Sequence, residues 1–192
     1  MVEIKKLFYK AFNKYATVPL EVLEVIFPLF DIYTIEKGRE IITQGKINSN
    51  EYFILNGLLR EFIIDEYGKE ITLDFYFGTS IIIPNFFRTK NNRSILSVQL
   101  LTNSIIAEID ATVFANVRNE HNALKEFSSS VITNCYKSRL HKQIFHASES
   151  GKEKLEQLRK DFPGIENQVP MQYIASYLGI TNVSLSRLRS RK

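Results

Sequence analysis

The stretch MQYIASYLGITNVSLSRLRS, residues 171–190, decides the fold of the C-terminal part of the chain. Gly179 lies between two segments rich in apolar residues, and glycine readily adopts the left-handed conformation that a tight turn needs. Ala175, four residues earlier, is small enough for a second helix to pack closely against the first. Pro170 suits the first turn of the first helix, and Thr181 suits the N-cap of the second. The spacing predicts a helix-turn-helix unit, with a small core formed by Ile174, Leu178, Ile180, Leu185 and Leu188.

The second of these helices carries side chains that suit contact with nucleic acid. In the major groove, arginine can bind guanine through two hydrogen bonds, asparagine can bind adenine, and an apolar group can contact the thymine methyl. Residues 167–192 contain four basic residues and no acidic one, so the formal net charge of +4 lies in this segment. An ordinary helical hairpin is the alternative. We expect a DNA-binding surface formed by Thr181, Asn182, Val183, Ser184, Ser186, Arg187, Arg189, Arg191 and Lys192.

The segment from Asp31 to Asp110 has a different pattern. Glycines at 38, 45, 57, 68 and 78 separate short runs of β-branched and aromatic residues. Short strands with turn signals about every 8–12 residues are typical of β-sandwiches and barrels. We expect hairpin turns at Asp65–Lys69 and at Asn56-Gly57. We expect strands at residues 39–43, 51–55, 58–65, 69–77, 97–101 and 104–109.

Helical patterns flank this β-rich segment. Apolar residues recur at steps of three and four over residues 3–15, which predicts an amphipathic helix. A second helical pattern runs from Ala111 to about Ser148 and contains an apolar seam at Val117, Leu124, Phe127, Val131 and Cys135. Either the β domain or the same helix of a second subunit could cover this seam, and we expect a homodimer.

These patterns predict an α+β protein with three parts. Residues 1–110 would form N-terminal helices and an all-β sandwich or barrel. Residues 111–148 would form a long connecting and dimerisation helix. Residues 149–192 would form the helix-turn-helix domain.

This order of elements resembles the cyclic-AMP receptor/Fnr family of bacterial transcription regulators, in the short C-terminal form of Bacteroidetes-type members. Residues 38–45, 52–60 and 65–71 resemble the hairpins of that family's β-roll. Residues 174–181 and 185–189 resemble its DNA-reading unit, and the resemblance covers about residues 30–192. It implies that the all-β part of residues 1–110 is a β-roll, a jelly roll of the effector-binding type with a small-molecule pocket inside it. It also implies a homodimer joined along the long helix, double-stranded promoter or operator DNA as partner, and RNA polymerase as a further candidate partner. Because the chain ends at Lys192, we expect no β-hairpin after the second helix.

The sequence departs from the family at the effector motif. Cyclic-nucleotide-binding members place a Glu directly after a Phe-Gly pair, where it meets the ribose hydroxyl, and an Arg-Ser/Thr-Ala triplet downstream, where the Arg meets the cyclic phosphate. Here Thr79 follows Gly78, and Arg93 lies one residue out of register, which in a strand directs a side chain to the opposite face. We therefore expect no response to cyclic AMP. A different effector, if the chain binds one, would use Gly78, Thr79, Arg88, Arg93 and Ser94.

Catalytic and metal-binding functions have little support. A single cysteine, Cys135, cannot form an internal disulfide, and it cannot alone hold an iron–sulfur cluster or a thiolate zinc site. A cupin-like enzyme would need histidine and carboxylate ligands on its strands. The three histidines, at 121, 141 and 146, lie instead in the helical region. We therefore expect no catalytic residues, no metal and no cofactor.

Two other functions compete with a DNA-binding regulator. One is a small-molecule sensor whose C-terminal unit binds a protein, and the other is a cupin-like enzyme. No apolar run approaches the roughly 18 residues that a membrane helix needs, and the N-terminus lacks the apolar core of a secretory signal. We therefore expect a cytoplasmic protein with no membrane partner.

Overall fold

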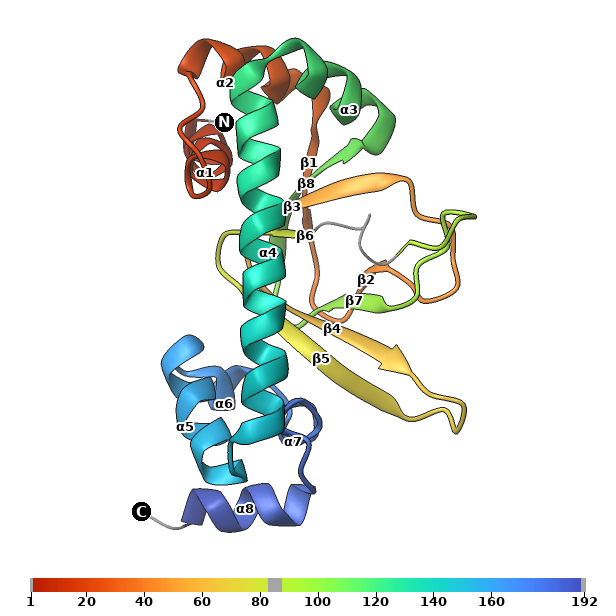
Figure 1. Cartoon of the computed structure of the whole chain (residues 1–192), viewed down its shortest axis with the longest axis vertical. Helices are drawn as coiled ribbons and strands as arrows, with labels where there is room; N and C mark the ends of the chain where they lie inside the picture. Colours follow the sequence, from red (N-terminus) through yellow and green to blue (C-terminus); the bar gives the residue numbers. More distant parts are fainter. Residues whose placement is uncertain (1, 83–87, 191–192) are drawn as a thin grey trace.

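The structure is a computed structural model, and it describes residues 2–82 and 88–190. A long central helix has a β-rich domain on one side and shorter helices near both of its ends (Figure 1). The helices are α1 (Val2–Asn13), α2 (Leu20–Ile26), a 3-10 turn η1 (Phe27–Leu29), α3 (Ala111–Glu120), α4 (Asn122–Ser148), α5 (Gly151–Asp161), α6 (Ile165–Gln168), α7 (Met171–Leu178) and α8 (Asn182–Ser190). The strands are β1 (Asp31–Ile35), β2 (Glu40–Ile42), β3 (Asn50–Asn56), β4 (Leu58–Ile64), β5 (Glu70–Phe77), β6 (Ser80–Ile82), β7 (Ser97–Leu100) and β8 (Ser104–Asp110).

The strands form two four-stranded sheets whose paired strands are antiparallel. Their orders are β1-β8-β3-β6 and β2-β7-β4-β5. Successive side chains of a strand alternate between the two faces, so each sheet directs one row of residues toward the other sheet. These rows form a core of Ile42, Tyr52, Ile54, Leu59, Ile82, Leu96, Val98, Leu100 and Ile106. The prediction of an α+β fold with a β-roll is confirmed.

The six expected strands are all present, with ends that differ from the prediction by at most one residue. The structure adds β1 and β6, which the sequence pattern did not separate from their surroundings. The turn between β4 and β5 is a hairpin, as expected. In it the Asp65 N–H donates to the Lys69 carbonyl over 3.0 Å, and the Asp65 carboxylate accepts from the Tyr67 and Lys69 N–H groups at 2.9 Å.

The prediction of a second hairpin, at Asn56-Gly57, is wrong. β3 pairs with β6 and β8, whereas β4 pairs with β5 and β7, so the chain crosses from one sheet to the other at Gly57. The φ of Gly57 is +150°, and a Cβ at this position would lie 2.2 Å from the Ser104 Oγ. The glycine is therefore required by a close approach between the sheets, and not by a tight turn.

The predicted single helix from Ala111 to Ser148 is two helices. His121 has φ −123° and ψ 117°, which is extended backbone, and it separates α3 from α4. The break changes the direction of the chain, so that Phe114 on α3 and Leu124 on α4 both enter the same apolar core.

The apolar seam of these helices is covered by the chain's own β-roll and α1. Val117, Leu124, Phe127 and Val131 are buried, whereas Cys135 is partly exposed. They share a core with Phe8 and Phe12 of α1 and with Phe53 of β3. The expectation that this seam joins two subunits is therefore wrong. A different face of α4 is exposed, and it carries Ile132, Tyr136, Leu140 and Ile144, with 46%, 67%, 44% and 54% of their surface accessible.

Candidate nucleic-acid interface

The helix-turn-helix unit has the geometry that its spacing predicts. Gly179 ends α7 with φ +68° and ψ 30°, and the N–H of Ile180 donates to the Ala175 carbonyl over 3.0 Å. Ala175 is 2% exposed, so a larger side chain there would separate the two helices. Pro170 is the residue before the first turn of α7, one position earlier than expected.

The start of α8 is fixed by Thr181. The N–H of Ser184 donates to the Thr181 hydroxyl over 3.1 Å, which confirms the predicted N-cap. Asn182, Val183, Ser186 and Arg187 are exposed on this helix, and Val183 has 61% of its surface accessible. Among the residues that the structure describes, Arg187 forms no ion pair.

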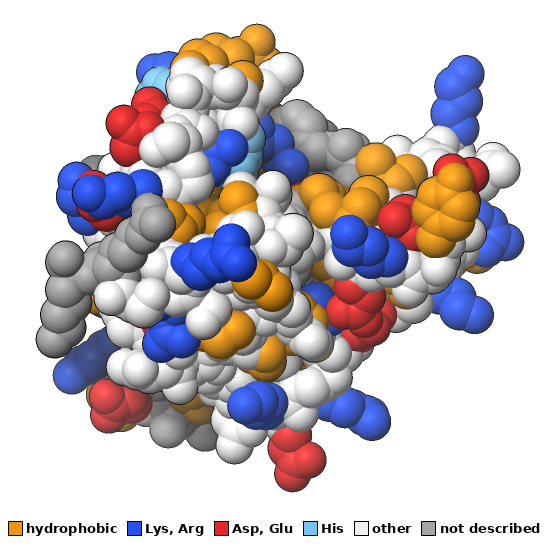
Figure 2. All heavy atoms as spheres, turned by 90° about the horizontal axis from the view of Figure 1, so that it is seen from below, with side chains coloured by type: hydrophobic (Ala, Val, Ile, Leu, Met, Phe, Trp, Pro, Cys, Tyr) orange, Lys and Arg blue, Asp and Glu red, His pale blue; other side chains and the backbone are white. Residues whose placement is uncertain are grey.

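α8 lies across one end of the molecule, roughly perpendicular to α4 (Figure 1). Figure 2 views the molecule from that end. Lysine and arginine side chains are spread over this face, with apolar side chains between them and fewer acidic ones. A polyanion approaching this end would meet more basic than acidic side chains.

The other basic residues of the predicted DNA-binding surface differ from Arg187, because one of them is paired with a carboxylate and two are not described by the structure. The guanidinium of Arg189 lies 3.0 Å from the carboxylate of Glu166, which Arg159 also binds at 2.6 Å. The hydrogen bond from Arg159 holds the pKa of Glu166 below its usual range, and Arg189 adds to this effect. Arg189 is thus attached to α6, while Arg191 and Lys192 lie outside the described residues.

The residues proposed for an effector pocket lie in two separate places. The Thr79 hydroxyl donates to the Leu55 carbonyl over 3.2 Å, and Lys14 donates to the Thr79 carbonyl over 2.7 Å. Gly78 precedes Thr79 with φ +65°. Gly78 and Thr79 therefore lie beside Leu55, at the end of β3 that faces α1.

The other three residues lie near the opposite end of β3. Arg88 donates to the Asn50 carbonyl and pairs with Glu51 at 3.5 Å. Arg93 is exposed and donates to the Gly45 carbonyl over 2.7 Å, while the buried Ser94 hydroxyl donates to the Leu96 carbonyl over 2.6 Å. Leu55 and Asn50 are separated by about 16 Å along an extended strand. The structure therefore does not bring the five residues together.

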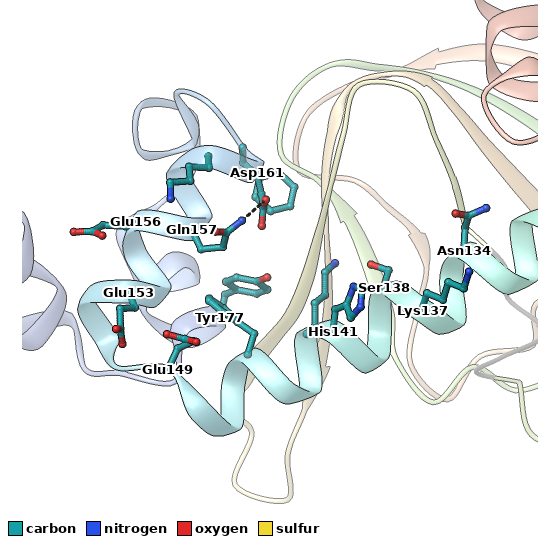
Figure 3. A pocket seen from close by; sticks show the side chains of 14 residues that line it. Asn134, Lys137, Ser138, His141, Glu149, Glu153, Glu156, Gln157, Asp161 and Tyr177 are labelled. Carbon is teal, nitrogen blue, oxygen red and sulfur yellow. Dashed lines mark hydrogen bonds between the residues drawn. The ribbon is translucent and has the colours of Figure 1, made fainter.

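An open groove of about 890 Å³ lies between α4 and the helices that follow it. In Figure 3, Lys137 and His141 project from α4 on one side, and Glu149, Glu153 and Glu156 lie on the other. Within residues 2–82 and 88–190, no three His, Cys, Asp or Glu side chains are close enough to hold a metal ion. The groove is an open, charged cleft between two parts of the chain.

Comparison with known proteins gives matches among solved structures alone. No model of a protein family matches the sequence, and no curated protein matches it. FixK2 from Bradyrhizobium japonicum superposes with a TM-score of 0.71 at 11% identity, over 84% of this chain and 83% of that one. CLP from Xanthomonas campestris, described as a c-di-GMP responsive global regulator, has a TM-score of 0.70 at 12% identity, over 90% and 91%. A candidate crp/fnr family regulator from Eubacterium rectale has a TM-score of 0.70 at 14% identity, over 94% and 85%.

The chain has the fold of the Crp/Fnr regulators. The resemblance noted in the sequence is thus confirmed for the fold of the chain. In this Crp/Fnr fold, none of the described helices is both long and apolar enough to cross a membrane.

Two buried charges in the β-roll of this Crp/Fnr fold were not anticipated. Arg60 and Glu61 are neighbours on β4, and each is 0% exposed. The Glu61 carboxylate accepts from the Tyr76 hydroxyl over 2.6 Å and pairs with Arg139 of α4 at 3.0 Å. Burial raises the pKa of Glu61, and Arg139 opposes that shift. A strand pattern cannot reveal such residues, because charged side chains in strands usually face solvent.

Proposed function

We propose that this chain is a homodimeric, sequence-specific DNA-binding transcription regulator of the cyclic-AMP receptor/Fnr type that does not respond to cyclic AMP. The exposed row at the start of α8 carries the proposal. In helix-turn-helix proteins the N-terminal residues of the second helix contact base edges in the major groove. Asn182 and Val183 lie at the start of α8, and Arg187 follows one turn later; all three are exposed. Their side chains offer donors, an acceptor and an apolar surface, which are the groups that distinguish bases.

The charge distribution supports a polyanionic partner. Residues 167–192 carry four basic residues and no acidic one. Arg187 has no competing carboxylate among the described residues, so its guanidinium is available for a base or a phosphate. A protein-binding C-terminal unit, the competing function, would not require this excess of positive charge.

The homodimer is proposed through the exposed face of α4. Ile132, Tyr136, Leu140 and Ile144 recur at steps of four, which places them in one row along the helix. Ser129, at the start of this row, is small and exposed, so a second helix can approach closely there. A second copy of α4 offers an identical row, and a twofold axis pairs such a row with itself. The dimer would present two α8 helices to one side of a duplex.

The contacts of the β-roll support the lack of a cyclic AMP response. The Thr79 hydroxyl already donates to the Leu55 carbonyl, and the Arg93 guanidinium lies at the surface against the Gly45 carbonyl. Neither is placed to bind a ribose and a phosphate inside the roll. The effector, RNA polymerase as a partner and a cytoplasmic location belong to this proposal as expectations.

A salt titration tests the proposal. Binding of the purified chain to duplex DNA should weaken as salt rises, with a linear dependence of log K on log salt, because each neutralised phosphate releases counterions. Arg187→Ala should weaken binding, whereas Lys90→Ala, which removes the same charge from an exposed loop of the roll, should not. A chain that binds no duplex at low salt would contradict the proposed function.

A further inference from the structure

Arg60 is a buried arginine at the contact between the β-roll and the helix-turn-helix. It is 0% exposed. Its guanidinium carbon lies 3.5 Å from the ring centre of Tyr173 on α7 and 4.0 Å from that of Phe62 on its own strand. The Arg60 Nε donates to the Gln99 side chain over 2.9 Å, and Glu70 provides the counter-charge. The cation is thus stacked between one ring of the roll and one ring of the helix-turn-helix.

Other contacts join the same two parts. The N–H of Thr72 on β5 donates to the Ser176 hydroxyl on α7 over 2.9 Å. The ring of Phe75 on β5 lies 5.2 Å from that of Tyr177. Leu58, Phe75 and Leu101 of the roll also share a buried core with the residues of α5, α6, α7 and α8. The β4–β5 hairpin and α7 therefore pack as one body.

The same hairpin is also attached to the long helix. Glu61 pairs with Arg139, and Asp74 pairs with Lys142, both residues of α4. Along the chain, only residues 149 and 150 connect α4 to α5. The hairpin is thus a further, noncovalent link between α4 and the helix-turn-helix, beside the direct contacts of His146 with Lys154 and Tyr177, and in Figure 1 it runs outward from α4 above α7.

The chemistry of Arg60 fits a role in orientation better than one in stability. An arginine without solvent must be paired, and a well-packed apolar side chain of similar volume is often at least as stabilising. Within the described residues, the Nη1 of Arg60 makes no hydrogen bond, so the site is not fully satisfied. A planar guanidinium between two rings is directional, because stacking is lost when either ring tilts or slides. Apolar contacts alone are not directional.

We propose that Arg60 is a positioning residue that fixes the orientation of the helix-turn-helix relative to α4 through its stack on Tyr173. The inference rests on the proposed function, because in a dimer joined along α4 this orientation sets the distance between the two α8 helices. A fixed distance selects one spacing of DNA half-sites. Without the stack, the directional contacts that remain include the hydrogen bond from Thr72 to Ser176, the hydrogen bond from Lys154 to the His146 carbonyl and the edge-on contact of the His146 and Tyr177 rings.

Three variants test the stack. Tyr173→Leu removes the ring from a partly exposed position, and Tyr173→Phe keeps the ring as the matched control. Arg60→Met removes the cation and keeps an apolar side chain of similar length. The first measurement is hydrogen exchange without DNA, read at the Thr72 amide, whose acceptor is Ser176. We expect about tenfold faster exchange in Tyr173→Leu and Arg60→Met, and wild-type exchange in Tyr173→Phe.

The second measurement uses palindromic duplexes whose half-site separation is changed by one or two base pairs. The wild type and Tyr173→Phe should bind one separation best. Tyr173→Leu should bind neighbouring separations nearly equally well, while its affinity for a single half-site is unchanged. A merely structural role would lower all affinities together.

Wild-type exchange and a wild-type spacing profile in Tyr173→Leu would overturn the inference. Should Arg60→Met fail to fold, Tyr173→Leu carries the same test at a partly exposed position. Should the wild type bind no DNA, the proposed function fails, and the exchange of Thr72 still decides whether the stack fixes the helix-turn-helix.

Discussion

The ring of Phe127 on α4 stacks on the ring of Phe12 on α1, with their centres 4.6 Å apart. Phe127 also stacks against Phe53 of β3, with ring centres 6.2 Å apart. The seam of the long helix is therefore part of the subunit's own core. The face that is free to meet a second subunit is the row that contains Tyr136, Leu140 and Ile144.

Substitutions on these two faces should have opposite consequences. Leu140→Asp with Ile144→Asp places charges on an exposed face, so the chain should stay folded and become monomeric. Phe127→Asp places an unpaired charge in a core where the residue is 2% exposed, which should cost several kcal/mol and unfold the chain. Circular dichroism reports folding, and light scattering at micromolar concentration reports assembly. A monomeric wild type, or a dimeric double variant, would contradict the proposed interface.

The stability of the chain should depend on the protonation of Glu51. Burial raises the pKa of the Glu51 carboxyl from 4.5 to about 7, although Arg88 and Arg118 lower it. Between these two values the folded state holds a proton that the unfolded state releases, so stability falls as pH rises. The loss attributable to this group is at most about 3 kcal/mol.

Urea unfolding at pH 5 and pH 8 measures this effect. Glu51→Gln should lose less stability between the two pH values than the wild type. The exposed carboxylate Glu126 provides the control, because Glu126→Gln should behave as the wild type. An equal loss in Glu51→Gln and the wild type would mean that Glu51 is ionised throughout this range.

Cyclic AMP should not bind tightly. Thr79 cannot supply a negatively charged acceptor for the ribose hydroxyl, and its own hydroxyl is already bonded to Leu55. Arg93 lies at the surface against Gly45 and not inside the roll. Calorimetry should show no binding tighter than roughly millimolar, which corresponds to about −4 kcal/mol. A micromolar dissociation constant would mean that other residues of the roll form the site.

The features that the sequence predicts best are those that depend on local spacing. Gly179, Ala175 and Thr181 are close in sequence, and a turn or a cap is set by neighbouring residues. The seam of α4 shows the limit of such patterns. Its period indicates that one face is buried, but not whether Phe12 of the same chain or a second subunit covers it.

In the DNA-binding surface, too, the sequence predicts what depends on position along one helix, but not what depends on packing between helices. The exposure of Asn182 and Arg187 follows from the position of the buried Leu185 on the same helix. The attachment of Arg189 to Glu166 does not, because it depends on how α6 packs beside α8. The burial of Arg60 likewise depends on Tyr173, which comes from another part of the chain.

Arg187 should read a base, whereas Arg189 should not. Arg187→Ala should cost about 1–3 kcal/mol in binding and relax discrimination at one base pair. Arg189 is bound to Glu166, so Arg189→Ala should weaken binding to all sequences similarly and leave the selected bases unchanged. Titrations with a set of single-base variants of the site measure both effects. If Arg187→Ala weakened binding to every DNA sequence equally, Arg187 would contact the DNA phosphates and not a base.

Selection of the purified wild-type chain on random duplexes tests whether a dimer of this protein reads a specific DNA sequence. We expect a palindromic motif whose half-sites lie about one helical turn apart, roughly 34 Å, because a symmetric dimer presents two α8 helices to one face of the duplex. A thymine should be favoured where Val183 meets the groove, since valine contacts a methyl and accepts no hydrogen bond. Recovery of no motif, or of a motif without twofold symmetry, would contradict sequence-specific reading by a dimer.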